Sequence, residues 1–287
     1  MTGSQLVAVL GRGVVDASAP VLLADDFGLT RGDGCFDATR VVTDASGTRV
    51  DNLDAHLARL GRSCRILAME GFDPDAWLDL VEQSVQAWRT PGEATLKLIV
   101  TRGLEHTPPR HLTGILTITP LDPVGIHQRQ GITIAALTRG YASDAFMDAP
   151  WLLGGAKTLS YAFNTAARRE ASRRGADDVL FMSTDGKALE GPTSALVWAK
   201  DGQLFTTQHD GTGILASITQ EMVFAHAEDE GVETDYVLAD LATVMDADAS
   251  WMLSSIRGVA PITAIDGVPV TTDAGLTGRI NRWARFA

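Results

Sequence analysis

The chain has 287 residues, of which 45% are hydrophobic and 21% are charged. This composition is typical of a soluble globular protein and excludes a disordered or fibrous chain, while the length favours two compact domains. The formal net charge of −12 disfavours nucleic acids and anionic membranes as partners, because the field of the protein repels phosphate groups. An anionic ligand would therefore have to be bound locally, by a few Arg or Lys side chains or backbone N–H groups.

No targeting or membrane segment is apparent. The first stretch, MTGSQLVAVLGRGVV, lacks a basic region followed by a long apolar run, so we expect no signal peptide. No segment approaches the roughly 18 consecutive apolar residues of a membrane span, and we expect a cytoplasmic protein. Cys35 and Cys64 are too few for a disulfide scaffold and lack metal-ligand spacing, which predicts two buried reduced thiols and no metal site.

The first half predicts short strands and two helices. Leu53, Leu57, Leu60, Cys64 and Leu67 recur at spacings of three and four, which is the period of an amphipathic helix. Apolar runs bounded by Gly and Asp turns indicate strands. The expected helices span 53–67 and 74–88, and the expected strands span 6–10, 21–24, 38–42, 48–50, 94–100, 114–118 and 131–137.

The segment 140–157 is rich in Gly, Ala, Asp and Pro and has neither period. We interpret 1–125 as an N-terminal domain, 126–156 as a linker region and 157–287 as a C-terminal domain. Both halves mix helices and strands without regular βαβ alternation, which predicts an α+β fold. In the second half we expect helices at 160–174, 218–230 and 274–285, and strands at 178–182, 195–199, 204–206 and 250–253.

Lys157 is the first candidate for chemistry. It follows Gly154-Gly155-Ala156 and precedes a predicted helix, so its side chain leaves a turn where backbone can approach a ligand closely. A lysine that forms an imine must be partly desolvated, whereas an ordinary loop lysine would be solvated. A phosphate-binding P-loop is excluded, because Ala156 and Trp151 stand where that motif requires glycine.

Further candidates fall into two groups. Glu190 lies in a turn and is either a simple turn residue or, beside a pyridoxal ring, the carboxylate that keeps the pyridine nitrogen protonated. The other group could bind phosphate through helix N-terminal amides, hydroxyls or a guanidinium, although each member could equally be a helix cap, a turn residue or a solvated charge. This group comprises Arg59 beside His56, Ile218 and Thr219 after Ser217, and the pair Ser254-Ser255.

A basic cluster lies between the predicted strands of the first half. It contains Arg102, His106, Arg110 and His111, which could bind substrate carboxylates or simply balance an acidic protein. The sequence contains no Gly-x-Ser-x-Gly, no His-Glu-x-x-His and no dinucleotide-binding glycine motif after a strand, so these enzyme classes are disfavoured.

Taken together, these segments resemble the aminotransferase class IV family. The matching segments, in chain order, are Gly32-Asp33-Gly34-Cys35-Phe36, His56-Leu57-Ala58-Arg59-Leu60, Lys157-Thr158, Glu190-Gly191-Pro192-Thr193-Ser194, Thr212-Gly213-Ile214-Leu215 through Ile218-Thr219, and Leu253-Ser254-Ser255. The chain departs from the family pattern at Ala195, Gln220 and Ser160-Tyr161, positions that bear on the substrate rather than on the cofactor.

The resemblance implies a two-domain fold-type IV pyridoxal-phosphate enzyme, similar to D-amino-acid aminotransferase, that acts on a small molecule as a homodimer. It implies that Lys157 forms the imine with pyridoxal 5'-phosphate and carries the proton, and that Glu190 contacts the pyridine nitrogen. Phosphate binding is implied for Arg59, Ile218, Thr219, Ser254 and Ser255.

The motifs around Gly32–Phe36 and Lys157 look most like those of 4-amino-4-deoxychorismate lyases, which release 4-aminobenzoate and pyruvate for folate biosynthesis. A D-amino-acid transaminase and a branched-chain or amine transaminase remain open. A protein that binds pyridoxal phosphate without catalysis would have no use for Glu190. For the substrate we suggest Phe36, Arg110 and Arg257 as contacts, Trp151 as a further pocket wall, and Asp37 or Thr39 for a second proton transfer.

Overall fold

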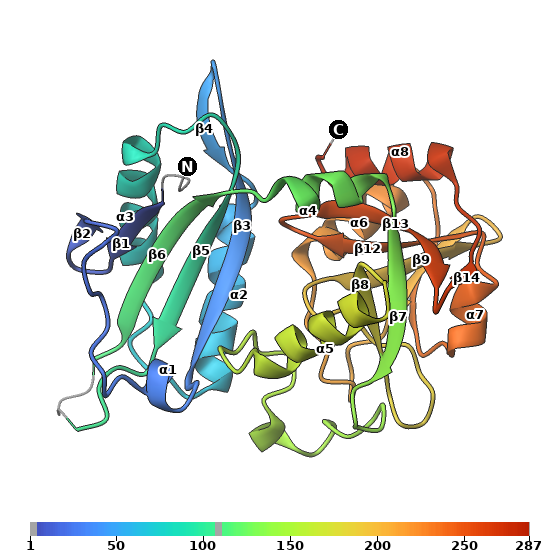
Figure 1. Cartoon of the computed structure of the whole chain (residues 1–287), viewed down its shortest axis with the longest axis horizontal. Helices are drawn as coiled ribbons and strands as arrows, with labels where there is room; N and C mark the ends of the chain where they lie inside the picture. Colours follow the sequence, from blue (N-terminus) through green and yellow to red (C-terminus); the bar gives the residue numbers. More distant parts are fainter. Residues whose placement is uncertain (1–4, 107–110, 287) are drawn as a thin grey trace. The chain divides into compact units, whose positions relative to one another are not determined.

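The computed structural model describes residues 5–106 and 111–286, and the chain folds into two compact units (Figure 1). Unit 1 comprises Met1–Asp122 and Ala156–Ser160, and unit 2 comprises Pro123–Gly155 and Tyr161–Ala287. Each unit combines a β-sheet with helices. The α+β class predicted from the sequence is therefore confirmed.

Unit 1 is built on a six-stranded antiparallel sheet in the order β2-β1-β6-β5-β3-β4. Helices α2 and α3 lie on one face of this sheet (Figure 1). The α3 N-terminus is fixed by Asp73, whose carboxylate accepts from the Asp75 and Ala76 amides, and Pro74 suits the first helical position. The elements are β1 Leu6–Val9, β2 Gly13–Val15, α1 Phe27–Thr30, β3 Gly34–Asp44, β4 Gly47–Val50, α2 Leu53–Ile66, α3 Pro74–Ala87, β5 Gly92–Thr101 and β6 Thr113–Pro120.

Unit 2 contains a mixed sheet in the order β11-β10-β9-β12-β13-β7-β8, with β14 paired to β13. Alternate residues of its central strands enter different cores, as the two-residue period of a strand requires. Trp198 and Met252 belong to one core, whereas Val197 and Trp251 belong to another that packs against α6 and α8. The sheet of unit 2 is thus buried on both faces at β9 and β12.

The strands of unit 2 are β7 Ile132–Thr138, β8 Asp178–Met182, β9 Ala195–Lys200, β10 Gln203–Thr207, β11 Thr234–Val237, β12 Ala249–Ser254, β13 Gly258–Ile265 and β14 Val268–Pro269. Its α-helices are α4 Pro123–His127, α5 Ala162–Arg173, α6 Ile218–Asp229, α7 Leu241–Met245 and α8 Ala274–Trp283. Two short 3-10 helices are η1 Gln128–Gln130 and η2 Pro150–Leu152.

The segment 126–156 is not a simple linker, which corrects the predicted organisation. It contains β7, which pairs in parallel with both β13 and β8 inside the sheet of unit 2. The following stretch Ala156–Ser160, expected to begin the second domain, belongs to unit 1. The predicted boundary failed because both placements depend on strand pairing between residues far apart in the chain.

Several strand predictions also differ from the structure, and β2, β11 and β14 were not expected. Residues 21–24 form no strand, and Leu23 is 62% exposed, because this apolar run finds no sheet edge. Conversely, β13 was not expected, since Pro261 interrupts its pattern and cannot donate a ladder hydrogen bond. In the structure Pro261 pairs with Trp251 of β12, and the register of β13 with β7 shifts further along, between Ile262 and Ala264.

Candidate active site

The Lys157 segment is held along β3 of unit 1. The Phe36 amide donates to the Lys157 carbonyl at 2.9 Å, and the Leu159 amide donates to the Gly34 carbonyl at 2.9 Å. Glycine at position 34 leaves room for this segment, because an added Cβ would lie 2.7 Å from Leu159 Cδ1 and 2.4 Å from the Val100 carbonyl oxygen of β5. The backbone of the candidate lysine is therefore fixed to a strand rather than to a mobile turn.

The Lys157 side chain lies over an aromatic ring. Its Nζ is 4.7 Å from the centroid of Phe36, within the range of a cation–π contact, and Lys157 is half-buried. Its backbone amide also donates to Ser63 Oγ at 3.1 Å. These contacts give Lys157 the fixed, partly desolvated position that an imine-forming amine requires.

Arg59 is fixed by a buried carboxylate. Its Nε and Nη2 each donate to Asp37 at 2.8 Å, and His56 Nδ1 lies 2.8 Å from the same carboxylate. Burial raises the pKa of Asp37, but the hydrogen bonds from Arg59 and His56 outweigh it and hold that pKa well below its usual range. The pKa of His56 is lowered mainly by its burial, which Asp37 only partly offsets.

This network contradicts the suggestion that Asp37 or Thr39 transfers a second proton. Asp37 is fully buried, and its ionised carboxylate is paired with Arg59 and His56. It therefore carries no proton to transfer near neutral pH. Thr39 is also fully buried, and its hydroxyl donates to the Asp51 carbonyl at 2.6 Å. Asp37 instead fixes Arg59, and Thr39 connects β3 to the backbone of Asp51.

In unit 2, Glu190 is anchored through both carboxylate oxygens. Oε1 accepts from Arg139 Nη1 at 3.0 Å, and Oε2 accepts from the Leu215 amide at 3.1 Å. Arg139 was not identified from the sequence, because it matches none of the motifs that were recognised. The only available signal was its position two residues after a predicted strand, which does not reveal a partner 51 residues away.

The predicted phosphate-binding residues of unit 2 meet at the N-terminus of α6. Ser217 caps this 12-residue helix by accepting from the Gln220 amide, and Ile218 and Thr219 form its first turn. The Thr219 and Ser255 hydroxyl oxygens are 3.0 Å apart, although the two residues come from different elements. Hydroxyls beside a helix N-terminus, where backbone amides point outward, form a donor set suited to an anion.

Arg257 forms contacts within the chain and does not have the free position that the suggested substrate contact requires. It is 9% exposed, and its guanidinium pairs with Asp178 at 2.7 Å and donates to Ser194 Oγ at 2.9 Å. Its own amide donates to Ser254 Oγ at 3.1 Å, and Arg129 donates to its carbonyl at 2.7 Å. Arg257 therefore fastens the turn that carries Ser254, and we do not retain it as a substrate contact.

The other suggested substrate residues are placed as follows. Arg110 lies outside the described residues. Arg102, from the same basic cluster, forms a two-pronged ion pair with Asp33, so it is engaged within unit 1. Trp151 is 74% exposed, and such an exposed side chain does not form the wall of a closed pocket within this chain.

Cys35 and Cys64 are both buried and not disulfide-bonded, as expected. Their sulfur atoms lie 3.5 Å apart, a proximity that the sequence did not indicate. The hydrogen bond from Cys64 and burial together raise the pKa of the Cys35 thiol, and a buried thiol of this kind is chemically inert.

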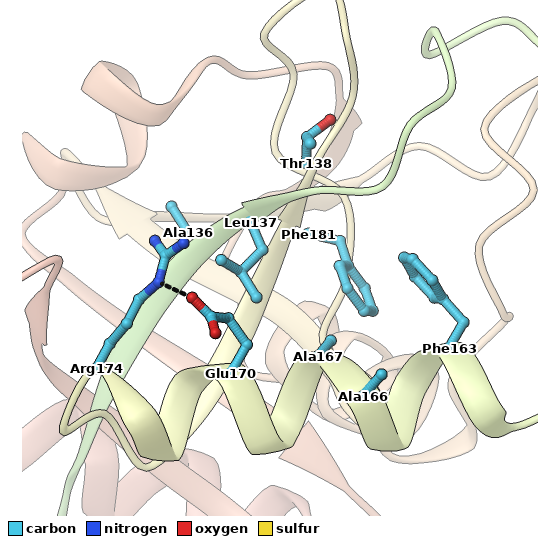
Figure 2. A pocket seen from close by; sticks show the side chains of 9 residues that line it. All are labelled: Ala136, Leu137, Thr138, Phe163, Ala166, Ala167, Glu170, Arg174 and Phe181. Atoms are coloured by element: carbon cyan, nitrogen blue, oxygen red, sulfur yellow. Dashed lines mark hydrogen bonds and ion pairs between the residues drawn. The ribbon is translucent and has the colours of Figure 1, made fainter.

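A separate groove of about 400 Å³ lies between α5 and strands β7 and β8 (Figure 2). Its walls are mainly apolar, with Phe163 and Phe181 stacked at 5.1 Å, and the pair Glu170–Arg174 lies at one end. None of the candidate cofactor or substrate residues lines it. Among the described residues, no helix is long and apolar enough to cross a membrane, and no cluster of three or more potential metal ligands occurs.

Comparison with known proteins identifies the family. The sequence model described as amino-transferase class IV matches residues 34–265, and the chain belongs to this family. It is therefore a pyridoxal-phosphate-dependent enzyme with the two-domain fold of type IV transaminases.

Individual relatives refine this picture. The chain is 36% identical over 270 residues to a bifunctional aminodeoxychorismate lyase / D-amino acid transaminase of Mycobacterium tuberculosis, covering 91% of this chain and 92% of that protein. A fold IV-transaminase from Curtobacterium pusillum superposes with a TM-score of 0.90 at 38% identity, covering 98% and 97% of the two chains. The pyridoxal-phosphate-bound form of a hypothetical aminotransferase from M. tuberculosis superposes with a TM-score of 0.92 at 33% identity and covers 98% of both chains.

Proposed function

We propose that this enzyme is a 4-amino-4-deoxychorismate lyase that releases 4-aminobenzoate and pyruvate. The observation that carries the proposal is the 36% identity, over 91% of the chain, to a protein named for this lyase activity. The Gly32–Phe36 and Lys157 segments support it, because the sequence there looks most like lyases of the family. D-amino-acid transamination is the second candidate, because the name of the same relative also contains that activity.

The residues present fit pyridoxal phosphate by the chemistry of their donor groups. We propose that Lys157 forms the covalent bond to the cofactor, that Glu190 contacts the pyridine nitrogen, and that Arg59 binds phosphate. Ile218 and Thr219 at the start of α6 would add phosphate donors, together with the Ser254-Ser255 turn. When bound, the cofactor supplies an aldehyde for an imine bond and a protonated ring that withdraws electrons from the neighbouring carbon.

The chain's own groups would then bind, orient and move a proton. The bidentate bond with Asp37 fixes the Arg59 guanidinium, and a pre-oriented fork suits phosphate oxygens. Lys157 Nζ would take the proton from the substrate carbon as general base. The enolpyruvyl group gains one proton as it leaves as pyruvate, which balances the proton lost as the six-membered ring becomes aromatic.

Two assays on the same purified holoenzyme distinguish the candidates. One supplies 4-amino-4-deoxychorismate, and the other supplies D-alanine with 2-oxoglutarate. We expect equal amounts of 4-aminobenzoate and pyruvate from the first assay, and no product from Lys157→Ala. D-glutamate from the second assay with no 4-aminobenzoate from the first would contradict the lyase and support the transaminase, whereas products in both would establish a bifunctional enzyme.

We further propose that the enzyme acts as a homodimer in the cytoplasm. The family resemblance supports the dimer. Light scattering of the purified holoenzyme tests the dimer directly, since a mass of one 30.5 kDa chain at working concentration would contradict it.

A further inference from the structure

The ion pair between Arg139 and Glu190 restricts the orientation of the Glu190 carboxylate. Arg139 directly follows β7, and its own amide donates to the Met182 carbonyl at 2.8 Å. The two side chains are only 20% and 17% exposed where they meet. Since the Leu215 amide binds the second carboxylate oxygen, both oxygens of Glu190 are held from defined directions.

Aromatic rings in turn restrict the Arg139 guanidinium. Its Cζ lies 5.9 Å from the centroid of Phe146 and 6.0 Å from that of Phe181. Phe146 is packed so closely on Gly213 that an added Cβ there would lie 2.5 Å from the ring. Phe181 is tied to Glu190 directly, because its amide donates to the Glu190 carbonyl at 2.9 Å.

We propose that Arg139 is a positioning residue that keeps Glu190 ionised and oriented toward the pyridine nitrogen of the cofactor. This inference rests on the proposed role of Glu190 and deepens it. A permanent positive charge favours the anionic form of the carboxylate that it contacts. Its effect on a base beyond Glu190 is weaker, because charge interactions decrease with distance.

The consequence concerns the proton that Glu190 and the pyridine nitrogen would share. With Arg139 present, the carboxylate is the poorer base of the two, and the ring nitrogen retains the proton. Without that charge, the proton moves toward Glu190, and the ring withdraws electrons less strongly. Arg139 would therefore affect the chemical step without contacting the substrate.

The test compares Arg139→Gln, which removes the charge, with Arg139→Lys, which keeps it. Arg174→Gln is the matched control, because Arg174 forms a comparable but exposed pair with Glu170 on α5 (Figure 2). The main readout is the pH midpoint at which the visible absorption band of the Lys157-bound cofactor titrates. The kinetic readouts are kcat and KM.

For Arg139→Gln we expect the midpoint to rise by about one pH unit, because a less electron-withdrawing ring leaves the imine nitrogen more basic. We expect kcat to fall about tenfold or more, the size of a hydrogen bond to a charged group, while KM changes by less than about threefold. Arg139→Lys should recover most of the midpoint, and Arg174→Gln should match the wild type. In a Glu190→Gln background, loss of the Arg139 charge should shift the midpoint no further.

Several outcomes overturn the inference. If Arg139→Gln has the midpoint and kcat of the wild type, the charge of Arg139 has no role in the reaction. The same conclusion follows if Arg139→Lys folds normally but has the midpoint and kcat of Arg139→Gln. If Arg139→Gln does not fold, Arg139→Lys decides: a near wild-type midpoint supports the charge, and a raised one opposes it. The proposed function fails separately, if borohydride traps no cofactor on Lys157 of the wild-type protein.

Discussion

Asp37 is a fully buried carboxylate whose oxygens bind an arginine and a histidine. Removing one partner of such a pair leaves an uncompensated charge in the interior, which costs far more than loss of an exposed pair. Asp33 provides the comparison within the same unit. It forms the same two-pronged contact with Arg102, but the two side chains are 30% and 26% exposed.

We expect Asp37→Asn to lower the free energy of unfolding by about 3–5 kcal/mol, and Asp33→Asn to lower it less, because the Asp33 pair keeps more contact with solvent. Chemical denaturation of the two variants and the wild type at neutral pH measures both effects. Equal losses would show that burial does not distinguish the two pairs.

The same variant has a defined pH dependence. Because the native pKa of Asp37 lies below its unfolded value of about 3.9, the ionised carboxylate stabilises the fold fully above that pH. The unfolded state binds the proton more readily, so this stabilisation is lost as the pH falls further. The difference in unfolding free energy between wild type and Asp37→Asn should therefore shrink below about pH 4.

Some residues of the candidate site could be proposed from the sequence, and others could not. Lys157, Arg59 and Glu190 could be proposed as candidates because they lie in short motifs whose residue types match a chemistry. Arg139 and the function of Asp37 were missed, because an ion pair depends on distance in the folded chain and leaves no local pattern. Arg257 was assigned to the substrate for its position near Ser255, whereas its partners Asp178 and Ser194 come from other strands and turns.

At the scale of elements, the turn before α6 connects the two groups of candidate residues in unit 2. Gly213 has a φ of +67°, a conformation that favours glycine, and it lies against Phe146. Leu215, two residues later, donates its amide to Glu190, and Ser217 then caps α6. The packing of this turn therefore affects both the Glu190 contact and the helix N-terminus.

We expect Gly213→Ala to destabilise the protein more than Gly186→Ala does. Gly186 has a similar φ of +81° but nothing within 4 Å of an added Cβ, so alanine there costs only backbone strain of about 1–2 kcal/mol. At Gly213 a forced movement of Phe146 should add about 1–3 kcal/mol. Thermal denaturation measures both variants, and equal melting temperatures would mean that Phe146 moves without cost.

Most helices and strands were predicted from the sequence, because caps and hydrophobic periods are local. The α3 helix begins after Asp73 at a proline, as its sequence indicates. The errors at residues 21–24 and at β13 have a common origin. Strand formation requires a partner strand, and neither the missing edge at residues 21–24 nor the pairing of β13 with β12 and β7 can be seen in a local window.

At the scale of the whole molecule, the candidate cofactor residues are divided between the two units. Lys157 and Arg59 belong to unit 1, whereas Glu190, Thr219 and Ser255 belong to unit 2. A ligand that binds only the folded chain stabilises it by mass action. Pyridoxal phosphate should therefore stabilise the wild-type protein against unfolding.

We expect pyridoxal phosphate at 100 times its dissociation constant to stabilise the wild type by about 2.7 kcal/mol, and pyridoxal at the same concentration to stabilise it less. Thr219→Ala combined with Ser255→Ala should reduce the advantage of the phosphate form, because it removes the two hydroxyls at the α6 N-terminus. Calorimetric unfolding with each ligand measures this. Equal stabilisation of the double variant by both ligands would support phosphate binding by these two hydroxyls. If pyridoxal phosphate still stabilised the double variant more than pyridoxal by the wild-type margin, the two hydroxyls would not bind the phosphate.

The sequence by itself determined the local helices and most strands, the family and its cofactor, and the candidates Lys157 and Glu190, because each depends on residue types within a few positions. Only the tertiary structure decided that the Lys157 segment joins β3 of unit 1 and that Arg139 holds Glu190. It also placed Asp37 on Arg59, 22 residues away. The reason is physical: side-chain periodicity and helix capping act over a few residues along the chain, whereas ion pairs and strand ladders depend on contacts that exist only once the chain is folded.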